Sequence, residues 1–371
     1  MRRSIGRSAL YGVLLGLATA AVAEAVRPRG GTTVLVDWDE VRRTATARMD
    51  QAAMDRARLA AAASGYRTLA GKLESQLLNF VGPLPRGASM PTFEAIDRAG
   101  WVDLNLTILR RVVDPVLEAG RMPNSLIVEV GKAGVDRYVG YMLAFLGSRV
   151  LGQYDPQLMA AEPIGAEGLY LVEPNVVAWQ QHAKLPDEDL RRWLILHEMT
   201  HAWQFAAHPG LRRHMEESMQ ELIDSVTTKG PAVTRVAAFA GVLPAQWRVM
   251  RKVQSTMSVV EGYSNLVMNQ LGHKLLPGFD RLEQAYRERS AGKNGLEVLI
   301  WKLTGLDLKL QQYKRGEAFC QAIYEQHGMQ VLNRVWEGPE MMPTLRELAN
   351  PVAWYRRTSA APSVTRARRV R

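Results

Sequence analysis

The chain has 371 residues, of which 47% are hydrophobic and 23% are charged. This length suits one large domain or two ordinary ones, and the composition excludes a disordered protein. The single cysteine, Cys320, excludes a disulfide scaffold and a cysteine-based zinc knuckle.

The net charge of +10 is concentrated at the two ends of the chain. Residues 1–31 carry five arginines and one glutamate, and residues 356–371 carry six arginines and no acid. The residues between them carry 36 basic and 36 acidic side chains. A nucleic-acid-binding domain is expected to carry basic charge on its folded body. We therefore expect no nucleic acid partner.

The N-terminal segment predicts export or membrane anchoring. Sixteen uncharged residues separate Arg7 from Glu24, and small residues at 21–23 precede that glutamate, as at a signal-peptide cleavage site. Sixteen residues are short for a membrane span, so a cleaved leader and an anchor stay open, with a cytoplasmic protein as the alternative. The predicted division is 1–31 as signal peptide or N-terminal anchor plus linker, 32–355 as one folded domain, and 356–371 as a basic disordered tail. Both ends could contact a membrane surface through their arginines.

Helical spacing of apolar residues dominates the body of the chain. It predicts helices over 38–63, 66–80, 92–119, 133–151, 187–207, 212–228, 245–271, 279–290, 294–303 and 315–327. The clearest strand is Leu169–Val172, bounded by glycine and proline. As an edge strand it could pair with an extended peptide, although a buried internal strand is the interpretation that we favour. The pattern predicts a mainly α fold with little β-structure.

The sequence His197-Glu198-Met199-Thr200-His201 carries the strongest chemical signal. Imidazoles at i and i+4 share one helix face, so both can reach one zinc ion. Glu198 is turned about 100° away from them, where a general base for the metal-bound water is needed. The alternative is two histidines hydrogen-bonded on a packed helix face.

A catalytic zinc usually has a third protein ligand. The metzincin pattern would place glycine at 204 and histidine at 207, where this chain has Gln204 and Ala207. The remaining candidates are His208, His214, Glu216, Glu217, Glu221 and Glu261. We favour Glu261, because it is the lone acid of a long apolar helix. Gly262 beside it would allow that helix to approach the metal helix closely.

Other residues near Glu261 are candidates for supporting roles. Asn265 lies one turn beyond Glu261, and its carbonyl could accept the N–H of a ligand histidine. A donor for the transition-state oxygen is also needed. Tyr263, His273, Tyr313 and Arg315 are its candidates, and the sequence does not rank them.

With these motifs in place, the chain resembles a bacterial family of zincin-like metallopeptidases, some of whose members are labelled as associated with deazaflavin-coenzyme biosynthesis. The resemblance extends over about residues 34–356. Besides the metal motif and Glu261-Gly262, it rests on segments at 36–39, 97–101, 151–156, 171–175, 305–313, 335–337 and 351–354. It implies a mostly helical single domain with a small β-sheet near the metal-binding helix, and zinc held by His197, His201 and Glu261. Many relatives have aspartate where Asn265 stands, and many begin near Trp38, so the leader is an addition.

The leading hypothesis is therefore a zinc-dependent metallopeptidase acting on a peptide or protein substrate, with Glu198 as its base. A hydrolase of small amides is one alternative. A zinc-containing binding or structural protein without turnover is another, and the intact Glu198 argues against it. A di-iron bundle would need two Glu-x-x-His motifs, and the chain has one.

Overall fold

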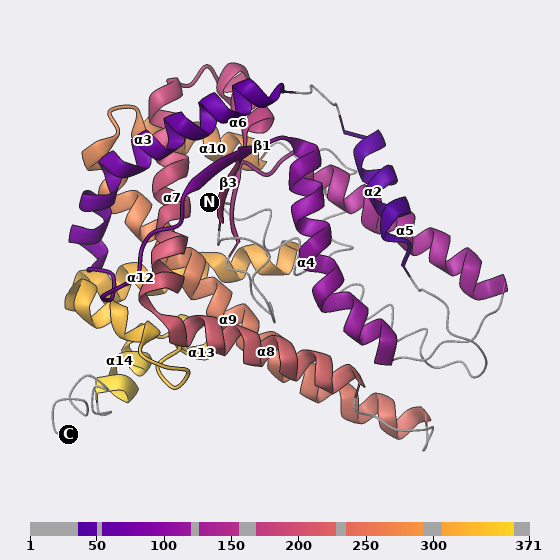
Figure 1. The fold of residues 1–371 in the computed structure, drawn as a ribbon. Helices are drawn as coiled ribbons and strands as arrows, with labels where there is room; N and C mark the ends of the chain where they lie inside the picture. Colours follow the sequence, from indigo (N-terminus) through magenta and orange to yellow (C-terminus); the bar gives the residue numbers. More distant parts are fainter. Residues whose placement is uncertain are drawn as a thin grey trace.

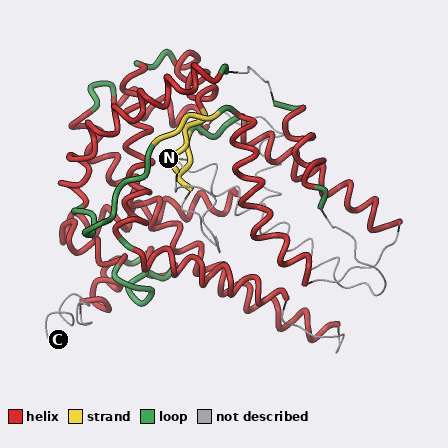
Figure 2. Tube along the Cα trace, viewed as in Figure 1, coloured by secondary structure: helices red, strands yellow, loops and turns green. Residues whose placement is uncertain are grey.

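Helices make up most of the computed structural model, and one small sheet lies among them (Figures 1 and 2). The structure describes residues 36–49, 54–119, 126–155, 168–227, 235–291 and 306–359. Figure 1 shows α3, α7 and α12 on one side of the sheet and α2, α4 and α5 on the other. The predicted mainly α fold with a small sheet is confirmed.

The described helices are α2 (Trp38–Ala47), α3 (Arg56–Val81), α4 (Arg98–Ala119), α5 (Leu126–Gly147), α6 (Glu173–Ala183), α7 (Asp187–Ala207), α8 (Pro209–Thr227), α9 (Arg235–Leu275), α10 (Phe279–Ala291), α12 (Leu306–Leu332), α13 (Leu345–Leu348) and α14 (Pro351–Ser359), with a 3-10 turn, η1 (Asn333–Trp336). Most follow the predicted helices, with shifted ends. The helix predicted over 294–303 lies outside the described residues.

The sheet has three strands in the order β1 (Phe93–Ile96), β3 (Gly168–Val172) and β2 (Gly152–Asp155). The predicted strand is therefore present as β3. It is the central strand, parallel to β1 and antiparallel to β2, so its suggested role as an edge strand is wrong. The sequence missed both neighbours, because β1 lies inside a stretch with helical spacing and β2 is only four residues long.

Two hydrophobic clusters fill the fold. The larger one joins α3, α7, α9, α12 and the sheet, and the smaller one joins α2, α4 and α5. Buried amides hold the clusters together. Asn175 on α6 donates 2.7 Å hydrogen bonds to the carbonyls of Gly147 and Val150, and the indole of Trp101 donates to Gln153 at 2.9 Å.

The close approach predicted for Gly262 is made to a different helix. A Cβ added there would lie 2.3 Å from the backbone carbon of Gly316 on α12, and one added at Gly316 would lie 1.9 Å from the carbonyl oxygen of Ser258. Side chains larger than hydrogen would push α9 and α12 apart. Gly262 thus fixes the helix that carries Glu261 against α12 and not against α7.

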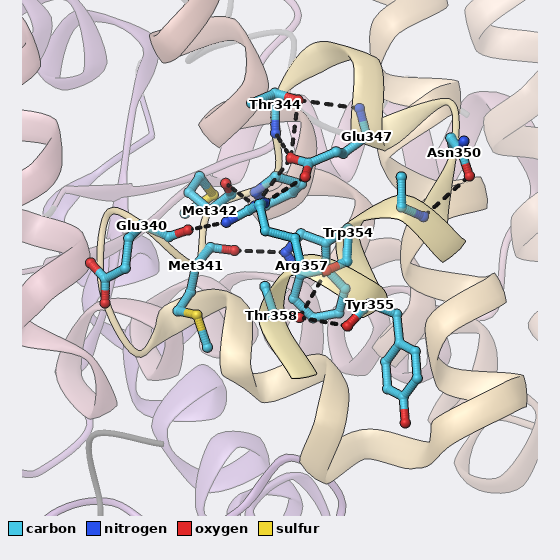
Figure 3. A network of polar contacts seen from close by, with 12 residues as sticks. Glu340, Met341, Met342, Thr344, Glu347, Asn350, Trp354, Tyr355, Arg357 and Thr358 are labelled. Carbon is cyan, nitrogen blue, oxygen red and sulfur yellow. Dashed lines mark hydrogen bonds and ion pairs between the residues drawn. The ribbon is translucent and has the colours of Figure 1, made fainter. Parts of the chain in front are cut away.

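The C-terminal segment folds back onto α9 and α12. We call residues 340–358 the C-terminal clasp (Figure 3). The helix α14 runs to Ser359, so the tail predicted to begin at 356 begins inside a helix, and this boundary is corrected. Its physical reason is Arg357, which was counted as tail charge but forms an ion pair with Glu347.

The predicted leader, residues 1–31, lies outside the described residues. Among the helices that the structure describes, none is long and apolar enough to cross a membrane.

Candidate metal centre

The metal motif lies on α7, one of the most deeply buried helices of the chain. Its first turn carries Asp187, Glu188 and Asp189, whose charges favour the positive end of a helix. Every residue from Trp193 to Phe205 is buried. A helix in this position presents its polar side chains to the protein interior, where each needs a partner or a ligand.

The structure brings the two motif histidines together with Glu261 of α9. The ring centroids of His197 and His201 are 4.7 Å apart. The Nε2 atom of His201 lies 3.7 Å from a carboxylate oxygen of Glu261. One ligand atom from each of the three residues lies within 4.8 Å of the other two, and all three side chains are buried. Glu261 is thus placed where a third ligand is needed.

The donor set fits a zinc ion. Ligand atoms at zinc distance in a tetrahedral arrangement are about 3.3–3.5 Å apart, close to the 3.7 Å between His201 and Glu261. Two imidazoles and one carboxylate form the ligand set of several catalytic zinc sites and leave a fourth position for water or substrate. His197, His201 and Glu261 would hold the ion.

Hydrogen bonds to the two rings come from Ser264 and Gln204, for which the sequence predicted no role. The Oγ atom of Ser264 lies 2.9 Å from Nδ1 of His197, and Oε1 of Gln204 lies 2.9 Å from Nδ1 of His201. In both rings this leaves Nε2 for a metal. A buried glutamine between Trp203 and Phe205 was the signal that could have drawn attention to position 204.

Asn265 lies elsewhere in this network than its predicted role requires. Its amide nitrogen donates to Glu317 of α12 at 3.2 Å, and its buried carbonyl oxygen accepts no hydrogen bond from the described residues. The oxygen that was expected to receive a histidine N–H therefore receives none. The rotation of α9 explains this, because it directs Ser264 rather than Asn265 to the ring of His197.

Glu198 is buried next to the sheet. A Cβ added at Gly152, the first residue of β2, would lie 2.9 Å from Oε1 of Glu198 and 2.7 Å from Leu171. Only a residue without a side chain can occupy this position with Glu198 where it is. The carboxylate is thus packed between the metal helix and the backbone of an outer strand of the described sheet.

The other candidate ligands have different neighbours. His208 packs between Trp203 and Trp336, and burial lowers its pKa to about 4. His214 has its Nε2 atom 3.1 Å from Thr256, and burial lowers its pKa as well. Within the described part of the chain, the residues grouped for a metal are His197, His201 and Glu261, without Glu216, Glu217 or Glu221.

The four candidate donors differ in accessibility. Tyr263 is fully buried, its hydroxyl donates to Asn333 at 2.7 Å, and burial raises its pKa well above the usual value. His273 is exposed beside Asp280, and Arg315 is exposed on α12. The side chain of Tyr313 lies outside the described residues. The hydroxyl of Tyr263 is therefore bonded to Asn333, on the side of α9 that faces α12.

Comparisons with known proteins found a matching family model and a similar solved structure. Residues 36–355 match a family model described as zincin-like metallopeptidase. A crystal structure from Chloroflexus aurantiacus, described as a candidate hydrolase with a novel fold, superposes with a TM-score of 0.68. The two chains are 33% identical, and the match covers 88% of this chain and 100% of the other. A search of curated proteins found no match.

Proposed function

Because the chain belongs to the zincin-like metallopeptidase family, we propose that it is a zinc-dependent hydrolase that cleaves peptide bonds with Glu198 as its general base. The observation that supports this most is the buried group of His197, His201 and Glu261. A bound zinc ion would act there as a Lewis acid that polarises the scissile carbonyl and acidifies a water.

Glu198 supplies the proton transfers of this reaction. Its carboxylate takes one proton from the attacking water, whose oxygen forms the new bond to the carbonyl carbon. The same carboxyl group then gives that proton to the leaving amine as the C–N bond breaks, so the side chain ends the cycle ionised. Burial between α7 and β2 holds the carboxylate in one place for both steps.

The sheet favours a peptide over a small amide. β2 pairs with β3 on one side and is an outer strand of the described sheet. Its first residue, Gly152, packs directly against Glu198. An outer strand can add an extended peptide through backbone hydrogen bonds. A peptide paired there would pass next to the proposed base.

The first experiment measures the zinc content of the full-length chain. We expect about one zinc per chain in the wild type and in Glu198→Gln, and much weaker retention in Glu261→Ala. Glu221→Ala is the matched control, since this exposed glutamate pairs with Lys252 on the surface. A wild-type chain that takes up no zinc after reconstitution would refute the metal centre.

The second experiment measures cleavage of a peptide library by the zinc-loaded protein. Glu198→Gln should reduce turnover by about 10²–10⁴-fold with zinc still bound, because the base is lost. Glu188→Gln is the control on the same helix, and its exposed side chain pairs with Arg192. Equal peptide turnover in wild type and Glu198→Gln would rule out this mechanism. Hydrolysis restricted to small amides would favour the alternative substrate class.

A further inference from the structure

Gln204 connects the two helices that supply the metal ligands. It lies on α7, three residues after His201, and is fully buried. Its Oε1 atom is 2.9 Å from Nδ1 of His201. Its Nε2 atom donates a 2.9 Å hydrogen bond to the carbonyl of Val260, the residue before Glu261. One amide group therefore links a ligand histidine to the backbone beside the ligand carboxylate.

The Val260 carbonyl fixes the direction of this amide. A carbonyl oxygen only accepts hydrogen bonds, so it must face the NH₂ group of Gln204. The amide oxygen then faces His201, and it too only accepts. The proton of the neutral imidazole is thereby held on Nδ1, and the lone pair is left on Nε2, the atom that lies 3.7 Å from Glu261.

We propose that Gln204 is a positioning residue for the metal, a role that rests on the zinc centre proposed above. It selects the tautomer of His201 that ligates through Nε2. It also fixes the separation between His201 on α7 and Glu261 on α9. Ser264 makes the corresponding contact with Nδ1 of His197, so both imidazoles are oriented by contacts that reach α9.

Packing alone does not require a glutamine at this position. The side chain lies in a hydrophobic core next to Trp203 and Phe205, where an apolar residue of similar length would avoid burying an amide. Both hydrogen bonds of the amide go to segments that carry a metal ligand. Removal of a residue that orients a metal ligand by a hydrogen bond typically lowers metal affinity by 10–100-fold.

The test measures zinc affinity of the full-length chain by competition with a chelator. Gln204→Met keeps the length of the side chain and removes both hydrogen bonds, so we expect its affinity for zinc to fall 10–100-fold. The control is Thr200→Val on the same helix. Thr200 is equally buried, but its hydroxyl donates to the carbonyl of Leu196 within α7. Its affinity should stay within about threefold of the wild type.

A second readout uses the metal-free protein. Nitrogen-15 NMR of the imidazoles should show His201 protonated on Nδ1 in the wild type and a mixture of tautomers in Gln204→Met. Gln204→Glu retains an acceptor for His201 but loses the donor to Val260. It should keep the Nδ1–H tautomer, and its affinity for zinc should lie between those of the wild type and Gln204→Met. Gln204→Glu also replaces Gln204→Met as the test variant if Gln204→Met does not fold.

The outcomes separate this proposal from the zinc centre itself. A wild type that binds zinc, with Gln204→Met binding it equally well, overturns the role of Gln204 and leaves the centre intact. The same holds if Thr200→Val loses as much affinity as Gln204→Met. Equal binding by Gln204→Glu overturns the part of that role that depends on the bond to Val260. A wild type that binds no zinc overturns both.

Discussion

The candidate metal centre and the C-terminal clasp are both networks of polar side chains packed against the core, but they bring different kinds of groups together. In the clasp, Arg357 contacts both carboxylate oxygens of Glu347, at 2.6 and 3.1 Å, and donates to the carbonyls of Glu340 and Met342 (Figure 3). Thr344 and Glu347 cap α13 reciprocally, and the indole of Trp354 donates to Met341. Arg357 and Glu347 thus pair with each other, and their other hydrogen bonds go to groups of the same segment.

The candidate metal centre instead gathers groups that can each bind a metal ion. Two imidazoles face a buried carboxylate, and within the described part of the chain the nearby carbonyl oxygen of Asn265 is buried without a hydrogen bond. Buried polar groups cost stability unless they are satisfied. The ion pair and the cap within the clasp offset the cost of burying its polar groups, whereas under the proposed function a zinc ion would offset part of that cost at the metal centre. This difference distinguishes a structural network from a ligand site.

Removal of the metal should have the largest effect, and it should change the stability of the metal centre but not that of the clasp. Zinc at about a thousand times its dissociation constant should stabilise the chain by about 4 kcal/mol, and chelation should remove that gain. Hydrogen exchange should accelerate at Val260 and Ser264 and remain unchanged at Trp354. His201→Ala should show no zinc-dependent gain. Equal acceleration in the clasp would show that the two networks form one unit and would break the comparison.

A methyl group at Gly152 tests whether the centre is as closely packed around its base as around its ligands. In Gly152→Ala the new Cβ would meet both Leu171 and Glu198, so the carboxylate must move. We expect peptide turnover to fall about 10–100-fold while zinc affinity stays within about threefold. Gly71→Ala on α3, where an added Cβ meets nothing within 4 Å, is the control. Normal turnover in Gly152→Ala would show that the position of Glu198 is not critical.

The ligands were easier to identify from the sequence than the residues that orient them. Helix geometry alone puts His197 and His201 on one face, and a lone acid in an apolar helix draws attention to Glu261. The partner of the His197 ring depends on how α9 is rotated against α7. That rotation directs Ser264 to the ring of His197 and Asn265 to α12. It also places the carbonyl of Val260 against Gln204, which lies on α7 with His201. Periodicity within one helix carries no information about its rotation against another.

In the fold, too, some elements could be predicted from local sequence patterns and others could not. Long helices such as α7 follow from apolar spacing, and β3 follows from a short apolar run between breakers. β1 was hidden inside a predicted helix, because four residues give too few repeats to distinguish the two periods. The helix α14 was missed because its arginines resemble those of a tail, and only Glu347, ten residues before Arg357, shows that Arg357 is paired.

The smallest expected effect comes from the clasp. Arg357→Met keeps the aliphatic stem and removes the ion pair with Glu347, in which the Arg357 side chain is 41% exposed. Because of that exposure, we expect a loss of only about 1 kcal/mol in the free energy of unfolding, measured with urea at pH 7. Arg356→Met, on the same helix and also exposed, is the control and should lose less.

The pH dependence of this loss identifies its source. Burial alone would raise the pKa of Glu347, but hydrogen bonds from Arg357 and Thr344 outweigh it and lower the pKa below the ordinary 4.5. A depressed carboxyl pKa stabilises the fold above the ordinary value, and that stabilisation is lost as the pH falls through the lowered one. The difference between wild type and Arg357→Met should therefore be constant from pH 7 to about pH 5 and shrink below the ordinary pKa. Zinc affinity should be unaffected. A weaker zinc affinity in Arg357→Met would instead show that the clasp positions Glu261, through the bond from Ser255 of α9 to the carbonyl of Pro343.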